Sequence, residues 1–259
     1  MAVFDSPKPL HGVNLSGWLV LEPWVTPSLF TGTGAFDELS LSTSLEASKF
    51  NQLVSTHRDS FIGKVDFERI AFRGFDSVRL QVPWFVFGAD GPMPGPSAGC
   101  IEYVDQAFDW AEEYNINVLL VIASAPGDDP SSPASFFGEV DSFRRAMLDV
   151  LGALCSRYES RSNFLGISPI DSIQGRSRHG FSVSEGVSPH LLRNFYRDAY
   201  EVVRASAGPE PAFVVHDAGV PSSWRAFMAP KRYENVWLDC HLYHYAESMN
   251  AAGPMGVRT

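Results

Sequence analysis

DSVRLQV, from Asp76 to Val82, is the stretch that most clearly predicts the fold. Its aliphatic residues alternate with Arg79 and Gln81, and successive side chains of a strand point to opposite faces. The aliphatic face is expected to pack against helices. The other face carries an arginine, which must find acceptors there because burying an unpaired charge is costly. This stretch therefore predicts a strand with helices on one side and a polar interior on the other.

Further β-rich runs recur before and after this strand, with helical patterns between them. They are a short strand near Gly12–Leu15 and the runs Ile116–Ala123, Phe164–Pro169, Ala212–His216 and Val236–Tyr243. Apolar residues at i, i+3, i+4 and i+7 predict helices over 104–111, 143–154 and 192–202. Ser188 and Pro189 mark the start of the last of these, and Gly74 the end of an earlier helix over 66–72. Alternating strands and helices are typical of an α/β fold with a parallel sheet.

The number of strands decides which α/β fold is expected. Six strands are counted by Tyr243, and 259 − 243 = 16 residues follow, whereas a closed barrel of this class needs eight strands. We therefore expect one domain over residues 1–259, a TIM-barrel-derived α/β fold that is incomplete, with about six β/α units instead of eight. The first and sixth strands would then have open edges, which the tail from Ala246, direct pairing of these two strands in a narrower barrel, or a second copy could cover; of these we expect a homodimer through the open barrel edge.

Composition and charge exclude several classes of partner. The chain has 20 Lys and Arg against 30 Asp and Glu, a net charge of −10, which disfavours nucleic acid and anionic membranes. No apolar run reaches the roughly 20 residues of a membrane helix, and the N-terminus lacks a signal-peptide pattern. The three cysteines show no zinc-binding spacing, so no metal and no cofactor is expected.

The last strand predicts where a ligand would bind. Trp237, Asp239, His241 and Tyr243 share one parity, and the alternate residues are apolar. In a barrel the polar parity points inward, and the carboxyl ends of the strands open onto the face where ligands bind. We therefore expect His241 and Tyr243 in the mouth of a binding site.

The stretch HGVNLSGWLVLEPWVTPSLF, from His11 to Phe30, closely resembles the opening of fungal exo-β-1,3-glucanases of glycoside hydrolase family five. The similarity continues in runs spread over nearly the whole chain: Gly74–Phe87, Tyr103–Leu120, Asn194–Arg204, Val214–Trp224 and Val236–Tyr245. The resemblance implies a (β/α)8 barrel that hydrolyses β-1,3-glucan with retention, through one acid/base carboxylate and one nucleophilic carboxylate.

The chain departs from the family pattern at the positions that carry the chemistry. The family places its acid/base in an Asn-Glu-Pro tripeptide, and here the matching residues are Asp171, Ser172 and Ile173. The family's nucleophile belongs to a seventh strand, which we do not expect in this sequence, and Ala123 stands where the family has a histidine. Loss of general acid catalysis costs about 10²–10⁴ in rate. These departures predict an inactive homologue, a pseudoenzyme.

Other sugar-facing positions of the family persist. The candidate ligand-binding residues are Glu22, Arg79, Trp84, Asp171, Asp217, His241 and Tyr243. Structural readings remain open for four of them: a solvated loop carboxylate for Glu22, a barrel anchor for Arg79, core packing for Trp84 and a turn cap for Asp217. His216, Asp217, His241 and His244 do not predict a metal site, because residues at i and i+3 of one strand fall on opposite faces.

The function expected from this pattern is non-catalytic binding of β-glucan, most simply β-1,3-glucan oligosaccharides. One alternative is a weakly active hydrolase or transglycosylase in which Asp171, Asp128 or Asp217 replaces the missing acid. Another is an interaction or decoy protein with no sugar site. Family habit suggests a secreted or cell-wall-associated protein.

Overall fold

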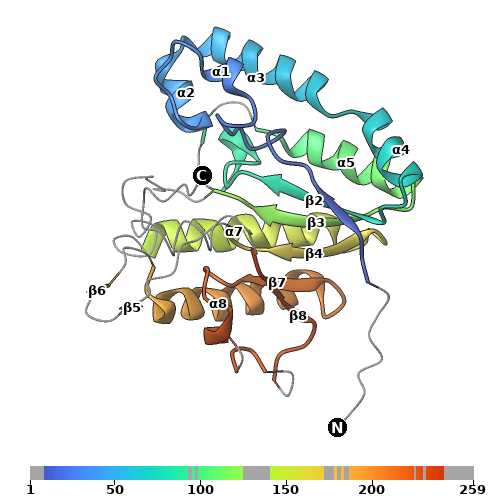
Figure 1. Cartoon of the computed structure of the whole chain (residues 1–259), viewed down its shortest axis with the longest axis vertical. Helices are drawn as coiled ribbons and strands as arrows, with labels where there is room; N and C mark the ends of the chain where they lie inside the picture. The colour runs from blue at the N-terminus through green and yellow to red at the C-terminus, as the bar shows by residue number, and fades with distance from the viewer. Residues whose placement is uncertain are drawn as a thin grey trace, which may run out of the picture.

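The computed structural model describes residues 9–92, 95–96, 99–124, 141–171, 178–179, 182–183, 187–224, 226–229 and 232–241. Six strands, all paired in parallel, form one sheet in the order β1-β2-β3-β4-β7-β8 (Figure 1). These strands are β1 (Gly12–Asn14), β2 (Ser77–Val82), β3 (Asn117–Ile122), β4 (Phe164–Ser168), β7 (Ala212–His216) and β8 (Val236–Asp239). A separate antiparallel pair is formed by β5 (Arg178–His179) and β6 (Ser182–Val183).

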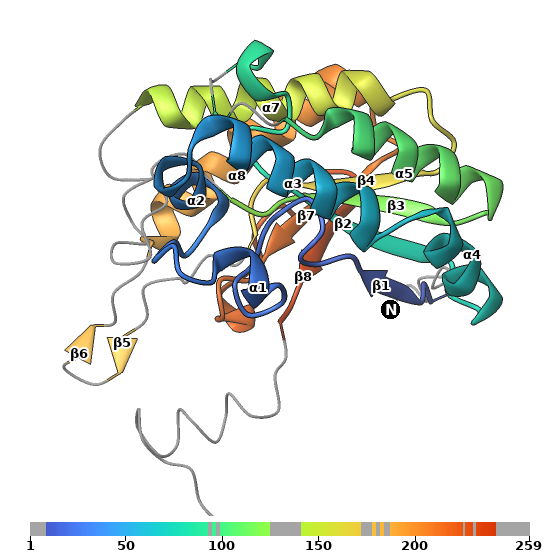
Figure 2. The same cartoon turned by 90° about the horizontal axis from the view of Figure 1, so that it is seen from above.

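Helices cover one side of the six-stranded sheet, with α5, α7 and α8 together on that side (Figure 2). The helices are α1 (Pro27–Phe30), α2 (Glu38–Ser44), α3 (Ala47–Phe61), α4 (Lys64–Phe72), α5 (Ile101–Glu113), α7 (Asp141–Tyr158) and α8 (Pro189–Ala207), with short 3-10 turns η1 (Gly88–Asp90) and η2 (Pro221–Trp224). The arrangement is a half-barrel, which confirms the predicted incomplete α/β barrel. None of the helices in these ranges is long and apolar enough to cross a membrane.

The core lies between the sheet and these helices, as the alternation in β2 predicts. Val78, Leu80 and Val82 are at most 1% exposed and belong to the main hydrophobic cluster. Arg79, of opposite parity, makes its contacts on the other side of the sheet with polar groups of neighbouring strands. The face of the sheet opposite the helices is therefore polar around Arg79, as the alternation in β2 predicts.

The outer strand β8 differs from the prediction. Leu238 was expected to pack against helices, yet 44% of it is exposed. The reason is that no helix in the described ranges follows β8 to cover it. In those ranges β1 pairs only with β2, and β8 only with β7. The dimer through these edges stays a prediction.

Helix boundaries largely follow the sequence signals. Helix α4 ends at Phe72, and Gly74 after it has φ +82°, the left-handed conformation that glycine tolerates. Helix α8 begins at Pro189 as predicted, but Ser188 makes no side-chain capping hydrogen bond. The fixed φ of proline at the first helical position favours this start.

Helices α2 and α3 were not predicted, and they hold the chain that follows β1 in place. The indole Nε1 of Trp18 donates to the carbonyl of Arg58 at 2.9 Å, and His57 Nε2 lies 2.7 Å from the carbonyl of Gly17. Both contacts join the segment after β1 to the last turns of α3. This segment leads directly to Glu22, so α3 helps to position a predicted site residue.

A close approach between β4 and β7 gives a stability prediction. A Cβ at Gly166 would lie 2.2 Å from the carbonyl oxygen of Ala212, an atom of the neighbouring strand's backbone. We expect Gly166→Ala to lower the free energy of unfolding by about 1–3 kcal/mol, because the two strands must separate. Urea unfolding measures this loss. Gly63→Ala is the control, since nothing lies within 4 Å of a Cβ there; equal losses in both variants would contradict the account.

Candidate functional site

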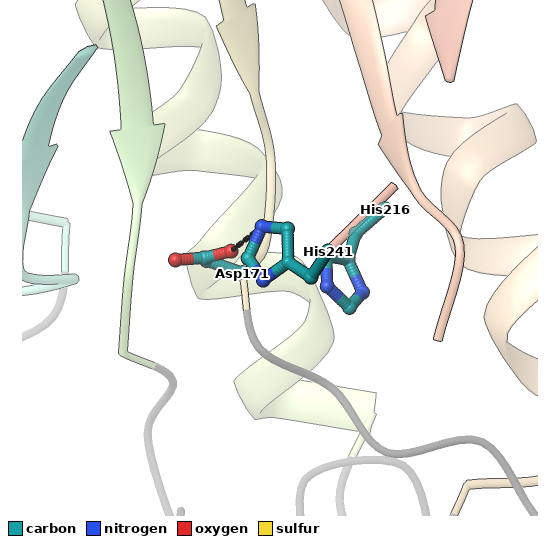
Figure 3. A group of neighbouring side chains, drawn as sticks. All are labelled: Asp171, His216 and His241. Atoms are coloured by element: carbon teal, nitrogen blue, oxygen red, sulfur yellow. Dashed lines mark ion pairs between the residues drawn. The ribbon is translucent and has the colours of Figure 1, made fainter. Parts of the chain in front are cut away.

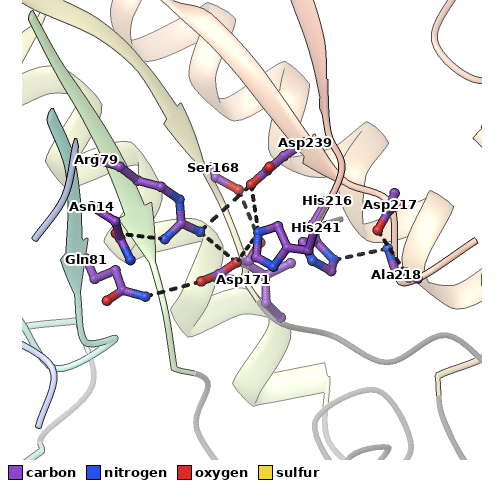
Figure 4. A network of polar contacts seen from close by, with 12 residues as sticks. Asn14, Arg79, Gln81, Ser168, Asp171, His216, Asp217, Ala218, Asp239 and His241 are labelled. Carbon is purple, nitrogen blue, oxygen red and sulfur yellow. Dashed lines mark hydrogen bonds and ion pairs between the residues drawn. The ribbon is translucent and has the colours of Figure 1, made fainter. Parts of the chain in front are cut away.

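Polar side chains meet at the carboxyl ends of β2, β4, β7 and β8. Figure 3 shows Asp171, His216 and His241 side by side: His216 is the last residue of β7, and the other two follow β4 and β8. Figure 4 adds Arg79 and Asp239, which face the same group. Because parallel strands end at one edge of the sheet, residues far apart in sequence come together there. We call these five residues the strand-end cluster.

Arg79 and Asp171 form the centre of the cluster. Arg79 Nη2 lies 2.7 Å from Asp171 Oδ1 and 3.8 Å from Asp239 Oδ2, while Nη1 donates to Asn14 Oδ1 at 3.2 Å. Gln81 donates to the other carboxylate oxygen of Asp171 at 3.4 Å. Arg79 thus finds the acceptors that its inward position requires, on three strands or strand ends of the half-barrel.

Asp171 is held as a carboxylate by these contacts. Its side chain is almost fully buried, and burial acts to raise its pKa, but the Arg79 guanidinium together with the two nearby histidines holds that pKa below its usual value. A carboxyl group with a lowered pKa carries little of the proton that a general acid must donate near neutral pH. This favours ligand binding over the acid role that the sequence left open for Asp171.

The histidines of the cluster lie against each other. The rings of His216 and His241 meet edge to face at 4.5 Å, and His241 Nε2 lies 3.2 Å from Asp239 Oδ2 and 3.7 Å from Asp171 Oδ1. Burial lowers the pKa of His216, and the neighbouring His241 lowers it further. His216 is therefore a neutral imidazole at neutral pH.

Three of these side chains have the composition of a metal site. Ligand atoms of Asp171, His216 and His241 all lie within 4.8 Å of one another. However, the backbone N–H of Ala218 donates to His216 Nδ1 at 3.0 Å, so the proton of the neutral ring sits on Nε2. A ligating histidine normally donates its second ring N–H instead. Arg79 also lies against Asp171, so the described residues fit a metal ion poorly.

The structure brings only some of the predicted residues together. Arg79, Asp171 and His241 belong to the strand-end cluster. Glu22 is half-buried near it, and burial raises its pKa. Trp84 is buried in the hydrophobic core, with its ring edge-on to Phe85 at 5.2 Å.

Asp217 is buried, and its Oδ1 accepts the N–H of Gly219 at 2.8 Å. This hydrogen bond is the turn cap that the sequence left open as an alternative to ligand binding. Tyr243, Ser172 and Asp128 lie outside the described residues.

Four neighbours were not chosen from the sequence: Asn14, Gln81, His216 and Asp239. Gln81 and Asp239 share the inward parity of Arg79 and His241, so that alternation was the available signal. His216 is the last residue of β7. The sequence instead predicts the neighbouring Asp217 as a ligand-binding residue, because of its carboxylate.

Comparisons with known proteins give the relatives of this chain. No protein-family model matches the sequence. A probable glucan 1,3-beta-glucosidase A of Aspergillus clavatus is 33% identical over 245 residues, which cover 91% of this chain and 55% of the relative. The glucan 1,3-beta-glucosidase of Blumeria graminis is 30% identical over 251 residues, covering 93% of this chain and 56% of the relative. The chain is similar to fungal glucan 1,3-beta-glucosidases. It spans little more than half the length of each.

Solved structures agree on the fold. The structure described as AoRut superimposes with a TM-score of 0.72 at 19% identity, covering 94% of this chain and 75% of the other. A rutinosidase from Aspergillus niger gives a TM-score of 0.71 at 17% identity, with 91% and 69% covered. At such identities these matches show the fold alone. They support the barrel-derived α/β fold described above.

The expectation that the chain is not an enzyme is wrong, and these relatives correct it. The proteins that match more than nine-tenths of it are named as glucosidases, and nothing in the described residues shows inactivity. The expectation depended on Ser172 and on a seventh strand, that is, on fixed family positions. Carboxylates also stand at other strand ends in this structure, at Asp171, Asp217 and Asp239.

The buried histidine gives a pH prediction. Because the pKa of folded His216 is lowered, its contribution to stability is fully present above about pH 6.5 and decreases as the pH falls below that value, where the unfolded chain takes up a proton. The loss is at most about 1.4 kcal/mol per pH unit. His216→Asn, which cannot titrate, should show a smaller loss between pH 7.5 and 5 in urea unfolding. The same pH dependence in both proteins would contradict the account.

Proposed function

We propose that this chain acts on β-1,3-glucan and holds the glucose units of the polymer at the strand-end cluster. The observation that carries the proposal is a set of buried polar atoms with no hydrogen-bond partner among the described residues. They are Glu22 Oε2, Arg79 Nε, Gln81 Oε1 and His216 Nε2. Each unsatisfied group costs about 1–3 kcal/mol, so a ligand that supplies both donors and acceptors gains by satisfying them.

The charges of the cluster favour a neutral ligand. The two carboxylates of Asp171 and Asp239 outnumber the single guanidinium of Arg79, so the cluster has no excess positive charge to attract an anionic group. Sugar hydroxyls donate and accept, and they match a site in which carboxylates alternate with Arg79, Gln81 and an imidazole. The chain's net charge of −10 opposes a polyanion. A neutral polysaccharide fits these conditions.

The fungal relatives indicate which polysaccharide to test. They are named for the 1,3-β-linked glucan, and they match more than nine-tenths of this chain. We propose the same linkage here. Such an activity would place the protein in the secreted or cell-wall fraction, where the polymer lies.

Isothermal titration calorimetry with laminaritriose tests the proposal, with cellotriose and maltotriose as linkage controls. We expect binding to laminaritriose with a higher affinity than to either control, and Gln81→Leu should weaken it severalfold. Gln52→Leu, on the exposed face of α3, is the matched control and should bind normally. Glucose released from laminarin in parallel samples measures hydrolysis. The absence of both heat and glucose with the wild-type chain would sink the proposal.

A further inference from the structure

His216 is the most deeply buried of the donor residues in the strand-end cluster. The residue is 4% exposed, and Nε2 has no hydrogen-bond partner among the described residues. The sequence alone assigned this histidine no role in binding. A buried polar atom without a partner is rare enough to require an explanation.

The backbone around His216 fixes which ring nitrogen carries the proton. The N–H of Ala218 donates to Nδ1 at 3.0 Å, and Ala218 has φ +53°, so the chain turns back sharply to make this contact. The Tyr196 hydroxyl contacts both backbone groups of His216, accepting its N–H at 3.1 Å and donating to its carbonyl at 3.3 Å. Nδ1 is an acceptor in this arrangement, and Nε2–H is the donor of the neutral ring.

The ring of His216 lies close to the carboxylate of Asp171, with the His241 ring in contact with both. Figure 4 shows Ala218 on one side of the His216 ring and Asp171 on the other. The ligand atoms of His216 and Asp171 lie within 4.8 Å of each other. An oxygen placed about 2.8 Å from both completes two hydrogen bonds of ordinary length. A hydroxyl suits this position, because it can donate to Asp171 and accept from His216.

We propose that His216 is a specificity-determining residue whose Nε2–H donates to one hydroxyl of the bound sugar, while the same hydroxyl donates to Asp171. This inference rests on the proposed function and adds to it a requirement for that hydroxyl. In a sugar without that hydroxyl, the Nε2–H donor of His216 and the buried carboxylate of Asp171 both lack a partner. Unpaired buried polar groups of this kind greatly lower the affinity of a site. A sugar that lacks this one hydroxyl is therefore rejected.

Two substitutions separate the donor from the structural role of the ring. In His216→Asn the amide oxygen stands near the position of Nδ1 and can still accept from Ala218, but the Nε2–H donor is gone. In His216→Gln the amide nitrogen stands near Nε2 and can donate to the ligand, but the acceptor for Ala218 is gone. We expect His216→Asn to bind laminaritriose about tenfold more weakly than the wild type, and His216→Gln to bind within about threefold of it.

Thermal unfolding of the same variants gives the opposite order if the inference holds, with His216→Asn the more stable. A purely structural role predicts instead that affinity follows stability, so that His216→Gln binds more weakly; that result would overturn the inference.

Monodeoxy laminaritrioses complete the test. One of them should bind the wild type more weakly than laminaritriose does, and its affinity should fall no further with His216→Asn. Nitrogen-15 NMR of the free protein should show the Nε2–H tautomer, and the Nδ1–H tautomer would also overturn it. If the wild type does not bind, the proposed function fails as well; if it binds and His216→Asn binds equally, only this inference fails.

Discussion

Arg58→Ala should lower the free energy of unfolding by about 3–5 kcal/mol, because it leaves the carboxylate of Glu38 buried without its charge partner. Both residues are nearly inaccessible, at 1% and 4% exposure. Arg58 Nη2 lies 2.9 Å from each carboxylate oxygen of Glu38 and 3.1 Å from the carbonyl of Leu19, and Nη1 donates to the carbonyl of Gly99 at 3.3 Å. One guanidinium therefore joins α2, α3, the segment after β1 and the segment before α5.

Urea unfolding of three variants checks this expectation. Arg161→Ala removes a partly exposed arginine that bridges Asp109 and Glu112, and it should cost less than about 1 kcal/mol. The double variant Glu38→Met/Arg58→Met should recover much of the loss, since it leaves no buried charge unpaired. Equal losses for Arg58→Ala and Arg161→Ala would show that burial of the pair has no special cost, which would contradict the account.

Arg79→Met should affect both stability and ligand binding. It removes the closest partner of Asp171, whose side chain is 3% exposed, and we expect a loss on the order of 3 kcal/mol. The pKa of Asp171 should rise, because the guanidinium that holds it down is gone. Affinity for laminaritriose should fall at least tenfold, since one of the cluster's donors is lost together with the position of Asp171.

The double variant Arg79→Met/Asp171→Leu separates these two effects. It should regain most of the stability, because the buried carboxylate is removed with its partner, but it should not regain binding. Arg69→Met is the control on the surface of α4 and should behave as the wild type in both measurements. Full recovery of binding in the double variant would mean that the pair is only a barrel anchor, the alternative that the sequence left open for Arg79.

The strands were predictable because each carries its own pattern. The alternation around Arg79 gave both the strand and the inward direction of the arginine, and Gly74 and Pro189 marked helix boundaries through their backbone chemistry. Helix α3 was missed although Phe50, Leu53, Val54 and His57 have helical spacing. Its polar majority and a histidine within the stripe weaken that signal.

The cluster was less predictable than the strands. The partner of Arg79 depends on the strand order and on a register shift between β3 and β4. Neither can be predicted from the sequence of a single segment. The donor role of His216 depends on the turn at Ala218, where a residue other than glycine has a positive φ. A local pattern identifies the strand end, but the tertiary structure decides which atoms meet there.

A crystal structure of the chain with a β-1,3-linked glucose trisaccharide tests the central claim most directly. The account predicts a glucose unit at the carboxyl ends of β2, β4, β7 and β8, with sugar oxygens within hydrogen-bond distance of Asp171, Arg79 and His216 Nε2. A trisaccharide bound elsewhere on the molecule, with these side chains still facing only one another, would contradict it.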